Sequence, residues 1–404
     1  MDKFERKVWG YALKNSISHE GFLNIGSVVS GMFHEFPKEE VLKKMDLIKN
    51  IASEIKFMEI EDQRAKFDEL GLENEISHRE GREGLPELPN AKKGKVIMRF
   101  APSASGPMHI GHALTSSLSY LLVKEYGGKF YLRIEDTNPE NIYPRAYKML
   151  EEEAKWLFEN NFELVIQSDR MDLYYSYAEK LIKKEAVYAC TCKTEDFKKF
   201  SDGMKNCPCR DLSVQENLER WKKMLDKKGF GEGEVVLRFK SLNGMKDKNP
   251  AMRDFPLARV NLTKHPKQGN KFRVWPLMNF AVAVDDIEMK MTHIIRGKDH
   301  RDNAERQKMI YRVLGLEKKT PWTAFLGRIK FKDLELSTTK IREDIENEKY
   351  SGWEDPKLPT LAALKKKGYK PQAFWKFAEK IGFSESDKVM DKKEFFTLLD
   401  SFNK

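Results

Sequence analysis

The sequence predicts an α/β protein built around a doubly wound parallel sheet. From Lys95 onward, short apolar runs typical of buried strands alternate with segments of helical periodicity, which is the pattern of βαβ units. The first of these runs, 96–100, passes through the turn Gly106-Pro107 directly into a helical pattern. Such a strand-to-helix junction places a helix N-terminus at the carboxyl edge of the sheet, where sheets of this Rossmann type bind their ligands.

Composition limits the classes of function. The chain has 404 residues, enough for several domains, and a net charge of +10 with 34% charged residues. That balance is typical of a protein with a polyanionic partner, although a lysine-rich surface alone gives the same composition. No apolar run approaches the roughly 18 residues that span a membrane. The charged start Met1–Arg6 lacks a signal-peptide core, so we expect a cytoplasmic protein with no membrane partner.

Changes of pattern divide the chain into five predicted parts. The linker Gly84–Asn90 contains two prolines and ends an N-terminal helical appendage. A nucleotide-binding domain follows in two halves, separated by an insertion, and a helical region ends the chain. The predicted bounds are 1–84 for the appendage, 85–189 and 275–345 for the two halves, 190–274 for the insertion, and 346–404 for the helical region.

The individual elements follow from periodicity. Residues 1–80 have helical spacing, interrupted by a glycine-rich turn region at 21–31. We expect strands at 96–100, 129–134, 162–166 and 293–295, and helices at 108–126, 139–160, 171–185 and up to 314. Residues 230–275 have a β pattern, and the chain from Thr360 onward is helical and basic. Its run Lys365–Lys367 fits either an RNA contact or a solvated helix face.

The stretch 99–112 is the first candidate site. His109 and His112 are three residues apart and therefore share one face of the helix that starts there. Gly111 between them has no side chain, so a flat ring can lie against the backbone. The alternative is a surface turn that contains two histidines by chance.

Charged residues at the ends of two predicted strands form the second candidate site. Glu135 and Asp136 follow the strand 129–134, and Arg296 follows the strand 293–295. A carboxylate at such a strand end can bind a substrate ammonium group, whereas Asp136 can equally cap the next helix. For Arg296 in isolation, a structural ion pair is the commoner case, and binding of a substrate carboxylate is the alternative.

The four cysteines form two close pairs, Cys190/Cys192 and Cys207/Cys209. Four thiolates suit tetrahedral zinc, and an intracellular reducing environment favours a metal site over disulfides. The alternative is four buried or free cysteines. A catalytic metal centre is disfavoured, because four cysteine ligands leave no open coordination position.

Five segments resemble signatures of class I aminoacyl-tRNA synthetases, in the form used by the archaeal and eukaryotic glutamyl-tRNA synthetases. The turn 106–112 is similar to the "HIGH" motif, 133–139 to "RIEDTNP" and 292–300 to "THVLRGKDH". Residues 335–342 resemble a degenerate "KMSKS" loop. Residues 352–360 resemble "GWDDPRLPT" and form the most specific match.

The resemblance implies residue roles. It implies transition-state stabilisation by His109, His112 and Lys340 together with Mg²⁺. It implies ATP binding by His109, Gly111, His112, Asp299 and Lys340. It implies glutamate binding by Arg99, Ser103, Glu135, Met278 and Arg296. Since glutamate and glutamine are nearly isosteric, an arginine that pairs with a carboxylate selects glutamate by charge.

The resemblance also implies the reaction and the partners: L-glutamate is activated by ATP to glutamyl-adenylate and transferred to tRNA(Glu), whose acceptor end the insertion grips. The helical region 346–404 would contact tRNA, and the N-terminal helices would contact RNA or a partner protein. Some members carry structural zinc in the insertion. Family members continue into anticodon-binding barrels, and no such pattern follows here, which leaves a fragment, a split protein or a short form open.

Two departures keep rival functions open. The family's pocket tyrosine is Met278 here, which cannot donate a hydrogen bond, and the central lysine of "KMSKS" is Thr338. The rivals are an enzyme that also charges tRNA(Gln), a glutaminyl-tRNA synthetase, and a non-catalytic tRNA-binding paralogue.

Overall fold

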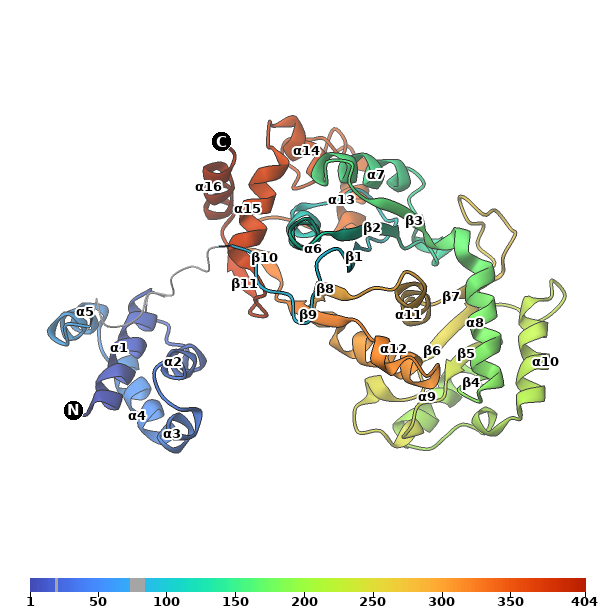
Figure 1. The fold of residues 1–404 in the computed structure, drawn as a ribbon, viewed down its shortest axis with the longest axis horizontal. Helices are drawn as coiled ribbons and strands as arrows, with labels where there is room; N and C mark the ends of the chain where they lie inside the picture. The colour runs from blue at the N-terminus through green and yellow to red at the C-terminus, as the bar shows by residue number, and fades with distance from the viewer. Residues whose placement is uncertain (19–20, 73–83) are drawn as a thin grey trace. The chain divides into compact units, whose positions relative to one another are not determined.

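The computed structural model describes residues 1–18, 21–72 and 84–404, which belong to two compact units, 1–82 and 83–404. Figure 1 traces the chain from the N-terminal helices to the C-terminal helix. The predicted helical pattern at 73–80 lies outside the described residues. Among these residues no helix has both the length and the apolar character that crossing a membrane requires.

The first unit is helical, as its periodicity predicts. It consists of α1 (Lys3–Ser18), α2 (Ile25–Met32), α3 (Lys38–Lys43), α4 (Met45–Lys56) and α5 (Ile60–Glu69). The predicted turn region at 21–31 is wrong from Ile25 onward, because α2 occupies it. Gly31 is needed for packing and not for a turn, since a Cβ atom there would overlap the ring of Tyr11 on α1.

The second unit contains the predicted parallel sheet, in two hydrogen-bonded pieces. In the first, β1 (Val96–Phe100) pairs on one side with β2 (Gly128–Ile134), which pairs with β3 (Glu163–Ile166). In the second, β8 (His293–Gly297) pairs with β9 (Trp322–Leu326). Thr292 joins the pieces, because its N–H donates to the carbonyl of Ile97 over 3.0 Å. The strands therefore lie in the order β3-β2-β1-β8-β9, with the first and second halves of the domain meeting at β1 and β8.

Helices cover the sheet and carry the chain between its strands. α6 (Ile110–Tyr126) follows β1 and packs on β1 and β2, and α7 (Ala146–Leu157) packs on β2. The predicted helix 139–160 is wrong at its start, over 139–145: only a short turn, Pro139–Asn141, precedes α7. Pro144 explains the difference, since a proline disfavours helical geometry at the residue before it. That residue, Tyr143, instead donates its N–H to the carbonyl of Ala104 over 2.8 Å.

The insertion is built on an antiparallel sheet. Its strands pair in the order β4 (Val187–Cys190), β5 (Val236–Phe239), β6 (Pro256–Val260) and β7 (Val274–Pro276). Its helices are α9 (Thr194–Asp202) and α10 (Val214–Leu225). One hydrophobic core joins this sheet to helices of the catalytic halves, namely α8 (Met171–Lys183), α11 (Met278–Glu288) and α12 (Arg301–Val313). The insertion is therefore packed directly against the catalytic halves: β6 contacts α11, which begins at Met278, and the turn 250–252 contacts α12. Figure 1 labels α11, α12 and the strands of this sheet.

The C-terminal helices complete the main core. They are α13 (Thr338–Glu346), α14 (Leu361–Lys366), α15 (Pro371–Ile381) and α16 (Lys392–Phe402), and the short strands β10 (Ile329–Phe331) and β11 (Lys388–Met390) pair in parallel. α15 packs against α6, and the indole N–H of Trp375 donates to the carbonyl of Leu157 over 3.0 Å. The run Lys365–Lys367 is exposed. At the other end of the unit, Leu88 of the predicted linker is buried in the same core.

Candidate active site

The turn that begins α6 is fixed by hydrogen bonds to two partners, the segment 359–361 and Glu153. Backbone hydrogen bonds join it to the distant segment 359–361: Ile110 N–H donates to Pro359 O over 3.1 Å, and Leu361 N–H to Met108 O over 2.9 Å. The buried carboxyl group of Glu153 accepts from Met108 N–H over 2.6 Å, and burial raises the pKa of Glu153 to about 8. The segment 352–360 is thus a structural partner of the histidine-bearing turn.

The two histidines stack at the N-terminus of α6. Their ring centroids are 3.8 Å apart, and Nδ1 of His109 caps the helix by accepting from Gly111 N–H over 3.1 Å. Since Nδ1 is an acceptor, the proton of neutral His109 is on Nε2, which can donate to a ligand. Burial, and then the neighbouring His112, lower the pKa of His109 well below its ordinary value; burial lowers that of His112 to about 4. Both rings are therefore neutral near pH 7.

A cavity of about 700 Å³ lies in front of these histidines. His109, Gly111, His112 and Asp299, all expected to bind ATP, line it together with residues of the segment 326–336. Nδ1 of His112 is buried and has no hydrogen-bond partner in the described part of the chain. A cavity of this size, at the positive end of a helix, fits a nucleotide with its phosphates.

Lys340 of the second signature does not line the cavity, but it is tied to a residue that does. Its Nζ lies 3.1 Å from a carboxylate oxygen of Glu335, which lines the cavity. Ser337 caps α13 by accepting from Lys340 N–H over 3.4 Å, so the loop and the start of α13 form one structure.

Gly106 brings the two signatures into contact. A Cβ atom at this position would overlap Cγ2 of Thr338 and lie 3.3 Å from the ring of Trp353. Glycine is therefore required because α13 and the segment after it press against the turn before His109. This contact joins the loop 335–340 to the turn 106–112, although more than 200 residues separate them in the chain.

We expect Gly106→Ala to lower the free energy of unfolding by about 1–3 kcal/mol, as overpacking of a tight contact does. The physical cause is the overlap with the methyl group of Thr338. Denaturant unfolding of Gly106→Ala and of the double variant Gly106→Ala/Thr338→Ser measures the effect. Serine lacks that methyl group, so the double variant should regain most of the loss. If it does not, Thr338 is not what excludes a side chain at position 106.

A buried cluster of opposite charges lies where β1 and β2 end. Nε of Arg99 is 3.0 Å from Asp286 on α11, and a terminal nitrogen of Arg133 is 2.6 Å from the same carboxylate. The other terminal nitrogen of Arg133 lies 3.1 Å from Glu135. Burial alone would raise the pKa of Asp286, but the two guanidinium groups hold it below its ordinary value. Arg99 and Glu135 are thus placed by ion pairs inside the protein.

Arg296 differs from these arginines, because its described hydrogen-bond partner is neutral. NH1 donates to Oε1 of Gln307 over 2.9 Å, and Nε is buried without a partner among the described residues. Burial, and then the positive charge of Arg99, lower the pKa of Arg296 to about 10. The sulfur of Met278 lies 3.8 Å from the amide nitrogen of the same Gln307. The structure therefore brings Arg296 and Met278 together through Gln307.

Ser103 and Glu135 extend the pairing of β1 with β2. The two residues form a parallel bridge, and Ala104 N–H donates to Glu135 O over 3.2 Å. Asp136 has a different role from the two considered for it. Its carboxylate accepts from Tyr147 and from Ser168, and its carbonyl oxygen lies 3.0 Å from Nε2 of His265 in the insertion. Asp136 therefore holds neighbouring segments and does not cap a helix.

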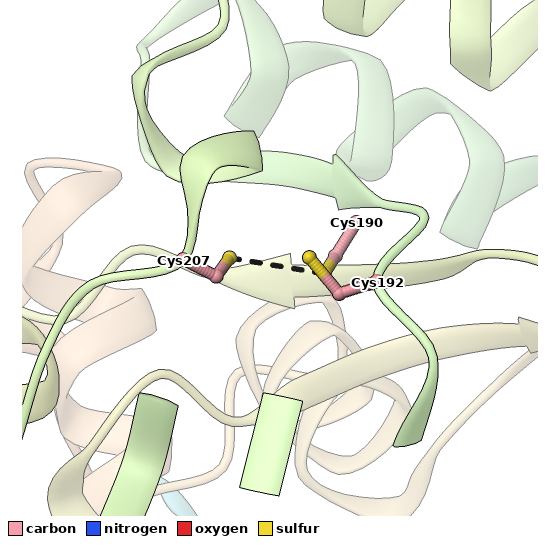
Figure 2. Close-up of side chains that lie close together, drawn as sticks. All are labelled: Cys190, Cys192 and Cys207. Carbon is pink, nitrogen blue, oxygen red and sulfur yellow. Dashed lines mark hydrogen bonds between the residues drawn. The ribbon is translucent and has the colours of Figure 1, made fainter. Parts of the chain in front are cut away.

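Three of the four cysteine side chains converge between β4 and the turn after α9, and Cys209 lies beside one of them, Cys192. The sulfur atoms of Cys190, Cys192 and Cys207 lie within 4.8 Å of one another. Figure 2 shows these three side chains close together. The pairs Cys190–Cys207 and Cys192–Cys209 are each 3.8 Å apart. A tetrahedral zinc ion with bonds of about 2.3 Å separates its sulfur ligands by about 3.8 Å. These distances fit zinc and are too long for a disulfide.

Three residues of the site had no role in the sequence interpretation: Arg133, Asp286 and Gln307. Arg133 and Asp286 stand inside apolar runs, and charges in such runs are kept only when they are paired. A charged residue inside an apolar run therefore indicates a buried ion pair, but the sequence does not show which residue the partner is. Gln307 carries no comparable signal, because a single amide in a charged helix is unremarkable.

The parallel sheet is divided between two halves of the domain, and two stacked histidines at the N-terminus of α6 face a cavity of nucleotide size. This combination defines the catalytic domain of a class I synthetase. The family model described as tRNA synthetases class I (E and Q), catalytic domain, matches residues 95–401, so the chain belongs to this family. Class I synthetases use ATP with Mg²⁺, and this chain therefore does so.

The chain resembles curated proteins over nearly its whole length. It is 40% identical over 396 residues to the glutamate–tRNA ligase of Methanothermobacter marburgensis, covering 98% of this chain and 70% of the relative. The glutamate–tRNA ligase of Pyrococcus abyssi is 42% identical over 391 residues, which cover 95% of this chain and 68% of the relative. A crystal structure of a glutamate tRNA ligase from Elizabethkingia meningosepticum shares the fold, with a TM-score of 0.54 and 22% identity over 75% of this chain and 68% of that one.

Proposed function

We propose that this protein is a glutamate–tRNA ligase. It joins L-glutamate to the 3′ end of tRNA(Glu) in two steps through glutamyl-adenylate, with release of pyrophosphate and AMP. The archaeal relatives that carry this name match 95% or more of the chain. The observation that carries the choice of glutamate is Arg296, a cation with a neutral partner in a cluster whose other arginines are ion-paired. A substrate carboxylate would supply the missing counter-charge.

The proposed roles of the site residues follow from their positions. His109 Nε2, the ring of His112 and the N-terminus of α6 bind the phosphates of ATP beside Asp299 and Gly111. Arg296 pairs with the γ-carboxylate of glutamate, and Arg99 adds positive charge behind it. Glu135 and Ser103 hold the α-amino group, and Met278 forms an apolar wall.

In the first step, the α-carboxylate of glutamate attacks the α-phosphate of ATP, and the bond to pyrophosphate breaks. No side chain acts as a nucleophile, so the protein contributes position and charge. His109, His112 and Lys340 stabilise the charge that builds up on the phosphates, where Mg²⁺ supplies further neutralisation. In the second step, a ribose hydroxyl of the terminal adenosine of tRNA attacks the adenylate, and AMP leaves.

The test is ATP–pyrophosphate exchange with glutamate or glutamine, each measured with tRNA(Glu), with tRNA(Gln) and without tRNA. We expect exchange with glutamate and not with glutamine, and aminoacylation of tRNA(Glu). The arm with tRNA is decisive, because enzymes of this branch often activate glutamate only when tRNA is bound. Exchange with glutamine alone would identify a glutaminyl enzyme, charging of tRNA(Gln) a non-discriminating one, and no exchange in any arm a non-catalytic tRNA-binding paralogue.

We also propose that Cys190, Cys192, Cys207 and Cys209 hold a structural zinc ion. The sulfur separations support this set, and Arg220 lies 3.5 Å from the sulfur of Cys209, where its charge favours a thiolate. Its place in the insertion suits a structural role beside RNA. Free thiols in this arrangement support a reducing compartment, the cytoplasm, as the site of action.

Metal analysis of the purified protein should find about one zinc ion per chain, as expected for a single four-thiolate site. Cys207→Ser should lose the metal and unfold at a lower temperature than the wild-type protein, because binding of the metal stabilises the folded insertion. Thr191→Ala, which changes a residue between two of the cysteines, is the matched control and should keep the metal. A metal-free wild-type protein that is folded and fully active would remove the zinc proposal.

The five-part division of the chain and an RNA or protein contact for the N-terminal helices are part of the same proposal. In the first unit Phe22 and Phe57 are 73% and 89% exposed, and a partner would cover such apolar side chains.

A further inference from the structure

Gln307 lies at the centre of the site and is used by none of the roles above. It projects from α12 and is 6% exposed. Its Oε1 accepts from Arg296 NH1 over 2.9 Å, and its Nε2 donates to Oδ1 of Asn279 over 3.3 Å. The same nitrogen lies 3.8 Å from the sulfur of Met278. One amide group therefore contacts both residues proposed to face the glutamate side chain.

The orientation of this amide is determined by its partners. A guanidinium group only donates hydrogen bonds, so the atom of Gln307 that faces Arg296 has to be the oxygen. The nitrogen then faces Asn279, whose own amide nitrogen donates to Asn303 over 3.1 Å. The reversed amide would place NH₂ against a cation. The chain of hydrogen bonds therefore runs in one direction, from Arg296 to Asn303, and keeps Gln307 in place.

A neutral partner has a specific consequence for Arg296. Arg99 pairs with Asp286, and Arg133 pairs with Asp285, Asp286 and Glu135, so both of these arginines have carboxylate partners. Gln307 holds Arg296 through an oxygen with no net charge, so the guanidinium is fixed without a directly paired carboxylate; Asp286 and Glu135 act on its pKa only from a distance. A carboxylate at position 307 would neutralise it, and an apolar side chain would leave its NH1 without a partner.

We propose that Gln307 is a positioning residue for glutamate specificity, which orients Arg296 while preserving its positive charge for the substrate carboxylate. This inference rests on the proposed function, because it assumes that Arg296 binds the γ-carboxylate. It accounts for how Met278, which cannot donate a hydrogen bond, can form part of a selective pocket: the polar contact comes from Arg296, and Gln307 determines its direction.

The test compares Gln307→Glu and Gln307→Met with the wild-type protein, and with Gln372→Glu, the same change at an exposed position of α15. The measurements are kcat and KM for glutamate, glutamine and ATP in pyrophosphate exchange with tRNA(Glu), the binding of glutamate by calorimetry, and thermal unfolding. For Gln307→Glu we expect KM for glutamate to rise about ten-fold or more, because the new carboxylate would pair with Arg296 and disrupt the buried charge pair between Arg296 and the substrate. KM for ATP should stay unchanged. The preference for glutamate over glutamine should fall as KM for glutamate rises.

Gln307→Met has nearly the same volume and should remain folded, so it tests the restraint alone. We expect it to weaken glutamate binding and activation, less than Gln307→Glu does, while Gln372→Glu matches the wild-type protein. If Gln307→Met activates glutamate with wild-type kcat and KM, or if Gln307→Glu keeps the wild-type preference for glutamate, the inference is wrong.

Failure of the proposed function gives a different result. A wild-type protein that binds glutamate but does not activate it would refute the ligase, while the binding arm still decides the role of Gln307. Loss of ATP and glutamate affinity together in a folded Gln307→Met protein would show general disorder of the site and would overturn the positioning role.

Discussion

Replacing Arg296 with leucine is expected to lower kcat/KM for glutamate by about 10²–10³-fold, as loss of one partner of a buried charge pair does. The physical reason is that the γ-carboxylate would enter the pocket without a cation to pair with. Leucine also leaves Oε1 of Gln307 without its donor. KM for ATP should change little, because Arg296 is not among the residues that line the nucleotide-sized cavity. Pyrophosphate exchange with tRNA(Glu) present measures both quantities.

Arg312→Leu is the matched control for this variant. Arg312 lies on α12, is 62% exposed and pairs with Glu317, so the same exchange there should leave glutamate activation unchanged. If Arg296→Leu activates glutamate as well as this control does, the γ-carboxylate is bound elsewhere. An equal loss for glutamate and glutamine would show that Arg296 supports the pocket and does not select the substrate by charge.

His109→Ala and Lys340→Ala are each expected to slow adenylate formation by about 10²–10³-fold, the usual cost of removing one group that stabilises a transition state. Glutamate binding should weaken far less, since both groups act on the charge that develops on the phosphates of ATP. Single-turnover formation of glutamyl-adenylate gives the rate, and calorimetry gives the affinity for glutamate. Equal effects on rate and affinity would contradict the transition-state roles.

Two further variants separate chemistry from structure. His109 also caps α6, so His109→Asn restores a side-chain acceptor for Gly111 N–H without restoring the second ring nitrogen. The His109→Asn variant should be more stable than His109→Ala and should still form glutamyl-adenylate slowly. Recovery of that rate would mean that His109 acts only as a helix cap. Lys349→Ala is the control for Lys340, because Lys349 is 57% exposed and pairs with Asp344.

The predicted elements were most accurate where local pattern and tertiary packing agree. The strand 96–100 is confirmed as β1, since a short apolar run can bury both of its faces only in the middle of a sheet. The helix predicted at 139–160 is confirmed over 146–157 as α7 and was wrong at its start, because Tyr143 bonds to Ala104, a contact that no local pattern contains. The turn predicted at 21–31 was wrong because Gly26 and Gly31 lie in a helix whose partner presses against it.

The sequence by itself determined the parallel sheet, the family and the residue types at the candidate site, because strand periodicity and the spacing of short motifs are local properties of the chain. Tertiary structure decided what each charge does. Arg99 forms an ion pair with Asp286, whereas Arg296 hydrogen-bonds to the neutral Gln307. The structure therefore distinguishes two arginines for which the sequence predicted the same role, binding of glutamate. It also joined Gly106 to Thr338 and Met108 to Leu361. Such pairings depend on which distant segments are buried against each other. A buried charge that lacks its partner costs several kcal/mol there, and no local sequence pattern shows which residues become partners.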